Sequence, residues 1–507
     1  MIRCNIYYSL IQLSKMTVKM SRSKILILFC VSFYFLEIGI ADVLKNDEEQ
    51  QLLDERIRSL VIVIISQSNS YHHVKAMKLR EEIYEHADKI SQARPVVHIS
   101  HLDFPHVGAW TFLPLISPLL EVHQTKATGV LFLQDHTVLD LRRFADVVAK
   151  YQHQVRFVGY ALHDNEASII HHFAFYEDPT RFKYPNLASG FYMTTELLLK
   201  LNDRLNQESI KTDFNIDPAH ELALFIWNEG NGTELTHDDT FCTTPPTGPA
   251  IECATYPQAF KPCSPAVDLE EVYFAVKTCK KFHADRLRVV RSTWAPHVQH
   301  IRYFSDHADR TIPTVNIGIP NTDVGHCEKT FAILRYALND INTIETQNGG
   351  DKIKWLVLVD DDTILSVSHV MNLLTCYNPE ESIVLGERYG YGVRTHKGYN
   401  YITGGGGTII SRRLLPSLAT HCLCPSARTP DDMYLGFCLR ELGTEIVHSP
   451  LFHQARPNDY SKGYLKSHET NTVSFHKHWM VDPIKIYKTW FEKADLLLES
   501  RVEHQEL

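Results

Sequence analysis

Short apolar runs recur along the chain, and several are followed by residues with helical periodicity. Leu356–Val359 is the clearest run, because four apolar residues stand together and charged residues lie on either side. Such a run is typical of a strand that is buried on both faces of a sheet. In His326–Ile344 the apolar residues recur at helical spacing, which predicts a helix packed against the core. This alternation of strands and helices predicts an α/β fold.

The same order of patterns occurs twice. A strand-like run followed by a helical stretch begins at Leu60 and again at Glu271, and LFLQDHT from Leu131 corresponds to LVLVDDDT from Leu356. Three further pairs follow in the same order, so we expect two tandem modules built on one scaffold. The expected fold is therefore two tandem GT-A-like (Rossmann-like) α/β modules, the first of them degenerate.

A proline-rich stretch, Thr243–Val267, separates the two repeats and has no clear period, which is typical of a linker or a strapped connector. The predicted domains are 42–242 for the first, non-catalytic module, 243–268 for the linker and 269–498 for the second, catalytic module. Each module is long enough to bury a core of its own.

Both ends of the chain suggest targeting signals. Basic residues, the apolar run Ile25–Leu36 and the small residues Gly39 and Ala41 predict a secretory signal at residues 1–41. A Golgi type II membrane anchor is the alternative, although the run is short for a span. The C-terminal tail, 499–507, ends in His-Gln-Glu-Leu, which resembles a retrieval signal for the endoplasmic reticulum. We expect a protein of the reticulum lumen that binds a retrieval receptor and keeps no membrane span once the signal is cleaved.

Composition narrows the possible partners and the compartment. A net charge of −9 and a pI near 6.3 argue against nucleic-acid binding, which favours a basic surface. Nine cysteines follow the leader without Cys-x-x-Cys spacing, so disulfides in an oxidising compartment are expected. Cys253 and Cys263 could close a local loop, but the sequence leaves the pairing open. Asn231 begins an N-glycosylation sequon.

Three consecutive acids, Asp360, Asp361 and Asp362, end the apolar run in the second repeat. Ligands bind at the carboxyl ends of strands in open α/β sheets. An Asp-x-Asp pair at such an end can hold a divalent cation and present it to a diphosphate. A solvated acidic turn is the alternative. The corresponding residues of the first repeat are Gln, Asp and His, which favours loss of this chemistry there, although its acids could instead have moved.

Other residues of the second repeat are candidate ligands of a nucleotide. Thr278 and Arg286 follow the predicted strand Val272–Val276, and Asp306 follows the next strand. Gly405 and Gly406 lie in a run of four glycines, where the absence of Cβ atoms lets a ligand approach the backbone. A flexible hairpin turn is the alternative for the glycine run.

Asp431 and Asp432 precede the predicted helix Met433–Leu442. One of two such acids can cap the helix while the other faces a pocket as a general base. His453 follows an apolar pair, Leu451-Phe452, and could supply a nitrogen ligand to a metal.

These motifs, taken in order, resemble the fringe-type β-1,3-glycosyltransferases of glycosyltransferase family 31. The resemblance covers about Glu271–Tyr487 and rests on VKTCKKFHADRL, RSTW, FSD, LVLVDDDT, TGGGGTIISRRL, PDDMYLG and LFHQ. Within this family, the tandem modules and the C-terminal tail point to the branch that extends O-linked fucose on thrombospondin type 1 repeats.

The resemblance implies a GT-A fold, UDP-glucose as the donor, Mn²⁺ and inversion at the anomeric carbon. It implies that Asp362 and His453 ligate Mn²⁺, with Asp360 at the ribose, at an ordered water or at the metal. Asp432 would be the catalytic base, with Asp431 the second candidate. The donor would be contacted by Thr278, Arg286, Asp306, Asp360, Asp361, Gly405 and Gly406. A fringe-like N-acetylglucosaminyl- or galactosyltransferase, and a non-catalytic chaperone or lectin, are the rival functions.

Overall fold

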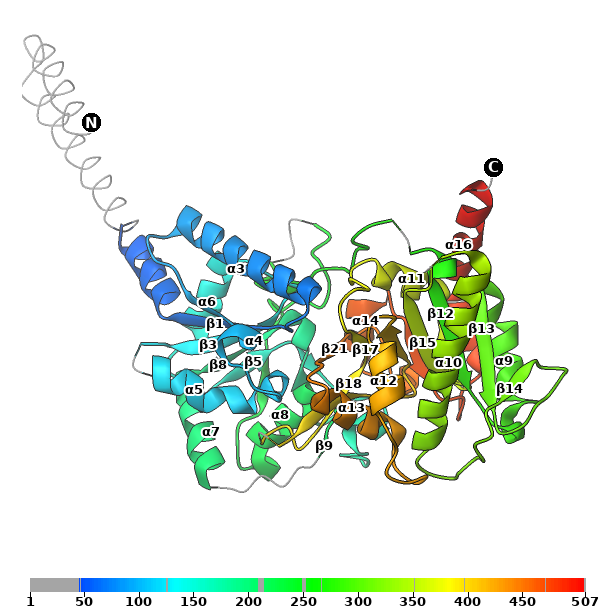
Figure 1. Ribbon diagram of the computed structural model, residues 1–507. Helices are drawn as coiled ribbons and strands as arrows, with labels where there is room; N and C mark the ends of the chain where they lie inside the picture. The colour runs from blue at the N-terminus through cyan, green and yellow to red at the C-terminus, as the bar shows by residue number, and fades with distance from the viewer. Residues whose placement is uncertain are drawn as a thin grey trace, which may run out of the picture.

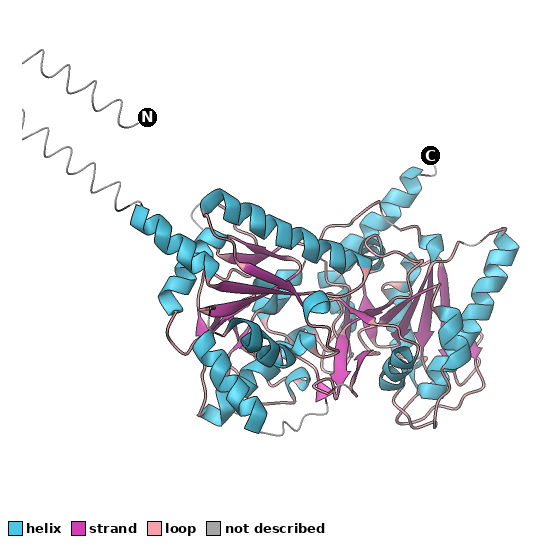
Figure 2. Ribbon diagram, turned by 60° about the vertical axis from the view of Figure 1, so that its left-hand side comes forward, coloured by secondary structure: helices cyan, strands magenta, loops and turns pink. Residues whose placement is uncertain are grey.

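The computed structural model describes residues 45–505, except for 46, 125, 208–213, 249–251, 266, 351, 396 and 470. The predicted signal at 1–41 lies outside the described residues. Two α/β modules lie side by side, the N-terminal one blue to green and the C-terminal one green to red (Figure 1). In both, helices cover the two faces of a central sheet (Figure 2). The described residues include no helix with the length and apolar character needed to cross a membrane.

The N-terminal module is built on a six-stranded sheet of order β10-β5-β8-β3-β1-β2. Its strands are β1 Leu60–Ile65, β2 Val96–Ile99, β3 Gly129–Gln134, β5 Phe157–Gly159, β8 Phe191–Thr194 and β10 Leu235–His237. The module's helices are α3 Ser70–Ile90, α4 Ser100–Asp103, α5 Leu113–His123, α6 Leu141–Tyr151, α7 Thr195–Gln207 and α8 Pro218–Trp227. Short pairs are formed by β4 Thr137–Leu139 with β11 Thr255–Pro257, and by β6 Ala161–Leu162 with β7 Tyr184–Pro185.

The C-terminal module has a seven-stranded sheet of order β14-β13-β12-β15-β20-β17-β21. Its strands are β12 Val272–Lys277, β13 His300–Ser305, β14 Thr314–Asn316, β15 Trp355–Asp360, β17 Val384–Gly386, β20 Thr408–Ser411 and β21 Ile446–His448. The module's helices are α9 Arg286–Ser292, α10 Cys327–Asn348, α11 Val367–Leu374, α12 Leu415–His421, α13 Asp431–Glu441, α14 Lys462–His468, α15 Pro483–Trp490 and α16 Glu492–Gln505. A two-stranded pair joins β16 Thr363–Leu365 to β22 Ser474–His476.

The two sheets share one topology. If β1, β2, β3, β8, β5 and β10 are matched with β12, β13, β15, β20, β17 and β21, both the neighbours and their directions agree. In each sheet a single central strand, β8 or β20, runs antiparallel to both of its neighbours. The five shared sequence patterns therefore coincide with a shared arrangement of strands.

Alternate residues of the central strands enter different cores. Phe274 and Val276 of β12 pack in one apolar cluster, whereas Tyr273 and Ala275 pack in another on the opposite face. The apolar runs are therefore strands buried on both faces, as the sequence predicts. Helix α10 places Phe331, one of its periodic apolar residues, in the second of these clusters.

A strand of the N-terminal module extends a sheet of the C-terminal module. β9 (Phe214–Asn215) pairs antiparallel with β18 (Arg388–Tyr391), which in turn pairs with β19 (Tyr399–Ile402). Nearby, the Gln67 side chain donates from Nε2 to the carbonyl oxygen of His448 at 3.0 Å and accepts from the backbone N–H of His448 at 2.7 Å. The modules are thus joined by backbone and side-chain hydrogen bonds.

Four disulfides join eight of the nine cysteines that follow the leader. The pairs are Cys242–Cys253, Cys263–Cys376, Cys327–Cys424 and Cys422–Cys438, and Cys279 is free and buried. The suggested loop between Cys253 and Cys263 is therefore wrong. Cys253 instead bonds to Cys242 and fastens the connector to the N-terminal module, which β11 of the connector also joins by pairing with β4. Cys263 bonds to Cys376 and fastens the connector to the C-terminal module.

Candidate active site

A cavity of about 210 Å³ lies at the carboxyl ends of β12 and β15. Its polar lining residues include Lys277, Thr278, Arg286, His326, Lys329, Asp360, Asp361, Asp362, Asp431, Asp432 and Gln454. The three consecutive acids and the two acids of α13 thus meet in one place, although about 70 residues separate them. Lys277, His326, Lys329 and Gln454 were not singled out from the sequence.

The turn after β15 fixes the three acids. Thr363 Oγ1 accepts from the backbone N–H of Asp360 at 3.2 Å and donates to the carbonyl oxygen of Gly405 at 2.8 Å. Thr363 therefore ties the acidic turn to the glycine run. The residues Asp361 and Asp362 are nearly buried, with exposed fractions of 3% and 7%, so a solvated acidic turn is excluded.

Asp360, Asp362 and His476 form a group that could hold a metal ion, since one ligand atom from each lies within 4.8 Å of the others. The pairing of β16 with β22 sets His476 opposite Thr363, and His476 Nε2 lies 3.1 Å from Asp362 Oδ1. Burial would raise the pKa of Asp362, but the hydrogen bond and charge of His476, together with Arg286, lower it to about 2. The acid is thus poised as an ionised ligand.

His453 is not a member of this group, but its buried Nε2 has no hydrogen-bond partner among the described residues, so its role as a metal ligand stays a prediction. Its Nδ1 is 3.0 Å from the carbonyl oxygen of Ser474, and its ring stacks on Phe475 in the core. Burial lowers the pKa of His453 to about 4, which keeps the imidazole neutral. The apolar pair before His453 carries the chain into the core, so the nitrogen beside the acids comes from His476 instead.

Thr278 and Arg286 both contact the acidic turn. Thr278 Oγ1 donates to Asp361 Oδ2 at 2.6 Å, and Arg286 Nη1 lies 2.9 Å from oxygens of both Asp361 and Asp362. The guanidinium of Arg286 also stacks on the ring of Phe282, at 3.7 Å from its centroid. Arg286 therefore places a cation beside the acids that line the cavity, where a diphosphate would need one.

Lys277 joins the two groups of acids. Its Nζ lies 3.0 Å from Asp360 Oδ1 and 2.6 Å from Asp431 Oδ2. Burial raises the pKa of Asp431, but the Lys277 charge and hydrogen bond outweigh that effect and lower it. Asp432 lacks this partner, and burial followed by the charge of Asp431 raises its pKa to about 6. Of the two acids, Asp432 therefore has the properties of a general base.

The glycine run closes one wall of the cavity. A Cβ atom on Gly405 would lie 2.3 Å from the His476 ring, so no side chain fits there. On Gly406 the nearest atom would be 3.4 Å away, and its backbone N–H donates to Gln454 Oε1 at 3.0 Å. Gly405 lines the cavity and Gly406 does not. The run is an ordered wall packed against His476 rather than a flexible hairpin.

Asp306 lies beside the cavity and does not line it. Its Oδ1 accepts from the backbone N–H of Lys280 at 2.8 Å and from Ser305 Oγ at 3.2 Å. These bonds hold the loop after β12 against the end of β13. A contact between Asp306 and a uridine stays a prediction.

The N-terminal module has a different set of residues at the corresponding position. Asp135, after β3, is buried and lies 2.6 Å from His72 Nδ1. The group Asp164, His171 and His220 could also be considered for a metal, but His171 already contacts Asp164 through Nδ1 and Asp217 through Nε2. Its ring is stacked on His220 at 3.9 Å, so their in-plane lone pairs do not converge on one ion.

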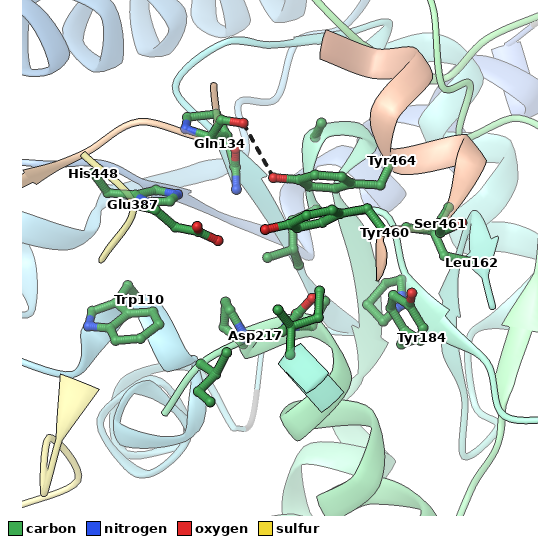
Figure 3. A pocket seen from close by; sticks show the side chains of 18 of the residues that line it. Trp110, Gln134, Leu162, Tyr184, Asp217, Glu387, His448, Tyr460, Ser461 and Tyr464 are labelled. Carbon is green, nitrogen blue, oxygen red and sulfur yellow. Dashed lines mark hydrogen bonds between the residues drawn. The ribbon is translucent and has the colours of Figure 1, made fainter. Parts of the chain in front are cut away.

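A cavity of about 100 Å³ lies at the corresponding strand ends of the N-terminal module, and residues of the C-terminal module form part of its lining (Figure 3). Gln134 and Asp217 of the first module face Tyr460 and Tyr464 of the second. The Tyr464 hydroxyl donates to the carbonyl oxygen of Pro450 at 3.4 Å. Aromatic side chains therefore occupy the space where the other module keeps its acids.

The chain is similar to known glycosyltransferases. A family model described as "Fringe-like" matches residues 267–496. Human and mouse proteins named "Beta-1,3-glucosyltransferase" are 46% identical to this chain over 445 residues, covering 87% of it and 86% and 88% of their own lengths. Manic fringe of Danio rerio, a "Beta-1,3-N-acetylglucosaminyltransferase", is 27% identical over 217 residues, or 38% of this chain and 59% of that protein.

A solved glycosyltransferase involved in glycosylation of the PBCV-1 major capsid covers 39% of this chain with a TM-score of 0.25 and 10% identity. The two mammalian relatives extend over both modules, whereas the family model matches the module that contains the acidic cavity. The chain belongs to the fringe-like glycosyltransferases, glycosyltransferase family 31.

Proposed function

We propose that this protein transfers glucose from UDP-glucose to the 3-hydroxyl of O-linked fucose on thrombospondin type 1 repeats, with inversion and with Mn²⁺. The observation that carries the proposal is one cavity that combines Asp360, Asp362 and His476 with the separate acid Asp432. The names of the two relatives at 46% identity support glucose as the sugar and β-1,3 as the linkage. The architecture of two modules supports the acceptor.

The oxygen and nitrogen atoms of Asp360, Asp362 and His476 suit a divalent metal ion. Two carboxylates and one imidazole are ligands that Mn²⁺ accepts, and the buried Asp362 keeps a low pKa of about 2. When bound there, a divalent cation would offset the charge that grows on the UDP leaving group. Asp360, Asp362 and His476 would hold it, and Gly405 leaves room for the His476 ring.

The remaining residues divide the work of a single displacement. Asp432 takes the proton from the attacking hydroxyl, because its carboxylate lacks the lysine partner that holds Asp431. Lys277 orients Asp360 and Asp431 through two ion pairs. Arg286 supplies a fixed positive charge beside the acids. One base and no enzyme nucleophile are what an inverting transfer requires.

We also propose the lumen of the endoplasmic reticulum as the location. The predicted signal and the terminal His-Gln-Glu-Leu support it, as do four disulfides, which persist in oxidising compartments. A retrieval receptor would then bind the C-terminus.

A donor competition experiment tests the proposal. The purified chain is incubated with a folded, fucosylated thrombospondin repeat and UDP-glucose, UDP-N-acetylglucosamine or UDP-galactose, with and without Mn²⁺. We expect transfer of glucose alone, and only with the metal. Preferred transfer of N-acetylglucosamine would instead support a fringe-like specificity, since fringe proteins are relatives at 27% identity. No transfer with any donor would contradict an enzymatic role.

A further inference from the structure

A groove of about 420 Å³ lies between the two modules and is separate from the acidic cavity. One wall comes from the loop before α5 of the N-terminal module, and the other comes from β19 and α13 of the C-terminal module. The residues that matter for its chemistry are His101, Trp110, Arg388, Tyr399, Asn400 and Arg440.

Helix α13 links the groove to the candidate base. Asp432 lines the acidic cavity, whereas Gly436 and Arg440 line the groove. These three residues are spaced four apart, so they lie on one stripe of the helix. A rise of about 1.5 Å per residue places Gly436 about 6 Å along the axis from Asp432. Residues Asn400 and Tyr401 of β19 pack against the helix at Gly436, and the groove begins there, about one helical turn from Asp432.

Hydrogen bonds join the two modules at the floor of the groove. Trp110 Nε1 donates to Asn400 Oδ1 at 2.9 Å, and Asn400 Nδ2 donates to the carbonyl oxygen of Val107 at 3.1 Å. Trp110 is only 7% exposed. The two walls therefore keep a fixed relation, which lowers the cost of ordering them when a partner binds.

The groove contains Arg388, a cation that forms no direct ion pair with a described residue. The Arg388 guanidinium stacks on Trp110, 4.5 Å from the ring centroid. Among the described residues it has no ion-pair partner, and its Nε has no hydrogen-bond acceptor. Glu445, the acid of the same groove, accepts from Ser68. The buried Nδ1 of His101, which also lines the groove, likewise has no hydrogen-bond partner among the described residues. Burial lowers the pKa of Arg388 to about 9, although the charge of Glu445 acts to raise it.

We propose that this groove binds the polypeptide of the glycoprotein acceptor, and that an acidic side chain of the acceptor pairs with Arg388. A carboxylate is the group of a polypeptide that a guanidinium can bind through two parallel hydrogen bonds. The inference rests on the proposed function, because it takes the accepting fucose to be attached to a folded protein. It gives the N-terminal module a role in binding the acceptor rather than in the chemistry.

The test is a binding titration of the folded, fucosylated thrombospondin repeat against the full chain and three variants. Arg388→Gln removes the unpaired cation, and Arg440→Gln removes an exposed cation of the same groove. Arg335→Gln, on an exposed face of α10, is the matched control. Binding of UDP and the melting temperature are measured in parallel to report on the donor site and the fold.

We expect Arg388→Gln to weaken acceptor binding about tenfold, the loss typical of a charge-assisted hydrogen bond. Arg440→Gln should weaken it about threefold, as a charge at the rim of an interface does, and Arg335→Gln should leave it unchanged. Affinity for UDP and for a free α-fucoside should stay at the wild-type value in all three. If Arg388→Gln fails to fold, the Arg440→Gln result decides.

Wild-type affinity for the repeat in folded Arg388→Gln and Arg440→Gln would overturn the groove assignment while the proposed function stands. A tenfold loss for the free fucoside as well would also overturn it, because the groove would then bind the sugar. A wild-type chain that neither binds nor glucosylates the repeat would overturn the proposed function itself.

Discussion

Lys277 Nζ lies 2.6 Å from Asp431 Oδ2, and this contact separates the roles of two adjacent acids. Asp431 also accepts from Thr330 Oγ1 at 2.6 Å, so it is held as an ionised structural partner. Asp432 Oδ1 accepts a hydrogen bond from the backbone N–H of Met433. Asp431 is thus held by an ion pair and a hydrogen bond, whereas Asp432 has no ion pair among the described residues and is the acid that we propose as the base.

Asp432→Asn should abolish transfer, with a loss in kcat of about 1,000-fold, because the amide cannot accept the proton. Since the folded protein raises the pKa of Asp432 to about 6, its ionised form costs stability above pH 6, and the variant should melt no lower than wild type at pH 7. Single-turnover assays and thermal melts measure both quantities. Retention of activity in Asp432→Asn together with its loss in Asp431→Asn would reverse the assignment.

The rate of transfer should depend on pH through Asp432. A base whose pKa is about 6 is ionised above that pH and protonated below it, so kcat should fall about tenfold for each pH unit below 6. Asp431 does not produce this fall, since its pKa is lowered, whereas Asp361, whose pKa burial also raises to about 6, titrates in the same range. The measurement is kcat between pH 4.5 and 8 at saturating substrates and metal. A rate that stays level down to pH 4.5 would exclude Asp432 as the base.

His476→Ala should raise the Mn²⁺ concentration needed for half-maximal activity by at least about tenfold, because the imidazole beside Asp362 is lost. His453→Ala should leave that concentration unchanged and lower the melting temperature, since the ring of His453 packs on Phe475. Titration of activity with Mn²⁺, together with thermal melts, distinguishes the two. The opposite pattern would restore His453 as the ligand.

The catalytic module expressed from residue 267 onward should be poorly soluble. Removing the first module exposes the edge of β18 that pairs with β9, and an uncovered strand edge promotes aggregation. It also uncovers Tyr460 and Tyr464, which face the first module's cavity. The measurement is the soluble yield and size-exclusion profile of the truncated chain beside the full chain. A monodisperse, active truncated module would contradict this dependence.

Cys376→Ser should lower the free energy of unfolding by about 2–5 kcal/mol, the cost of losing a disulfide that closes a long loop. The bond to Cys263 spans 113 residues and fastens the connector to the catalytic module. Cys279→Ala keeps all four disulfides and serves as the control. Urea unfolding measures the difference. Equal unfolding midpoints for Cys376→Ser and wild type would show that this disulfide does not contribute to the stability of the fold.

Much of the site could be read from the sequence because local patterns determine it. The run before Asp360 predicts a buried strand, and strand ends in an α/β sheet point to one edge, which is where Asp360–Asp362 lie. The start of α13 likewise brings Asp431 and Asp432 to the cavity. The repeated order of patterns anticipates the shared strand order of the two sheets.

The position of His476 could not be read in this way. It reaches Asp362, 114 residues away in the sequence, because β22 pairs with β16, and nothing local in either strand specifies that register. The chain has 28 histidines, so residue type alone does not single one out. Lys277 was missed for a related reason: it ends β12, and its meaning depends on the acids that neighbouring elements bring to it.

The pairing of β9 with β18 has a genetic consequence. β18 is bonded to β19, and β19 leads directly into the glycine run that packs on His476. A substitution at Asn215, which is fully buried in the N-terminal half, would therefore disturb the acidic cavity. In a mutational screen, loss-of-activity alleles should appear in both halves of the gene, even though the chemistry resides in one.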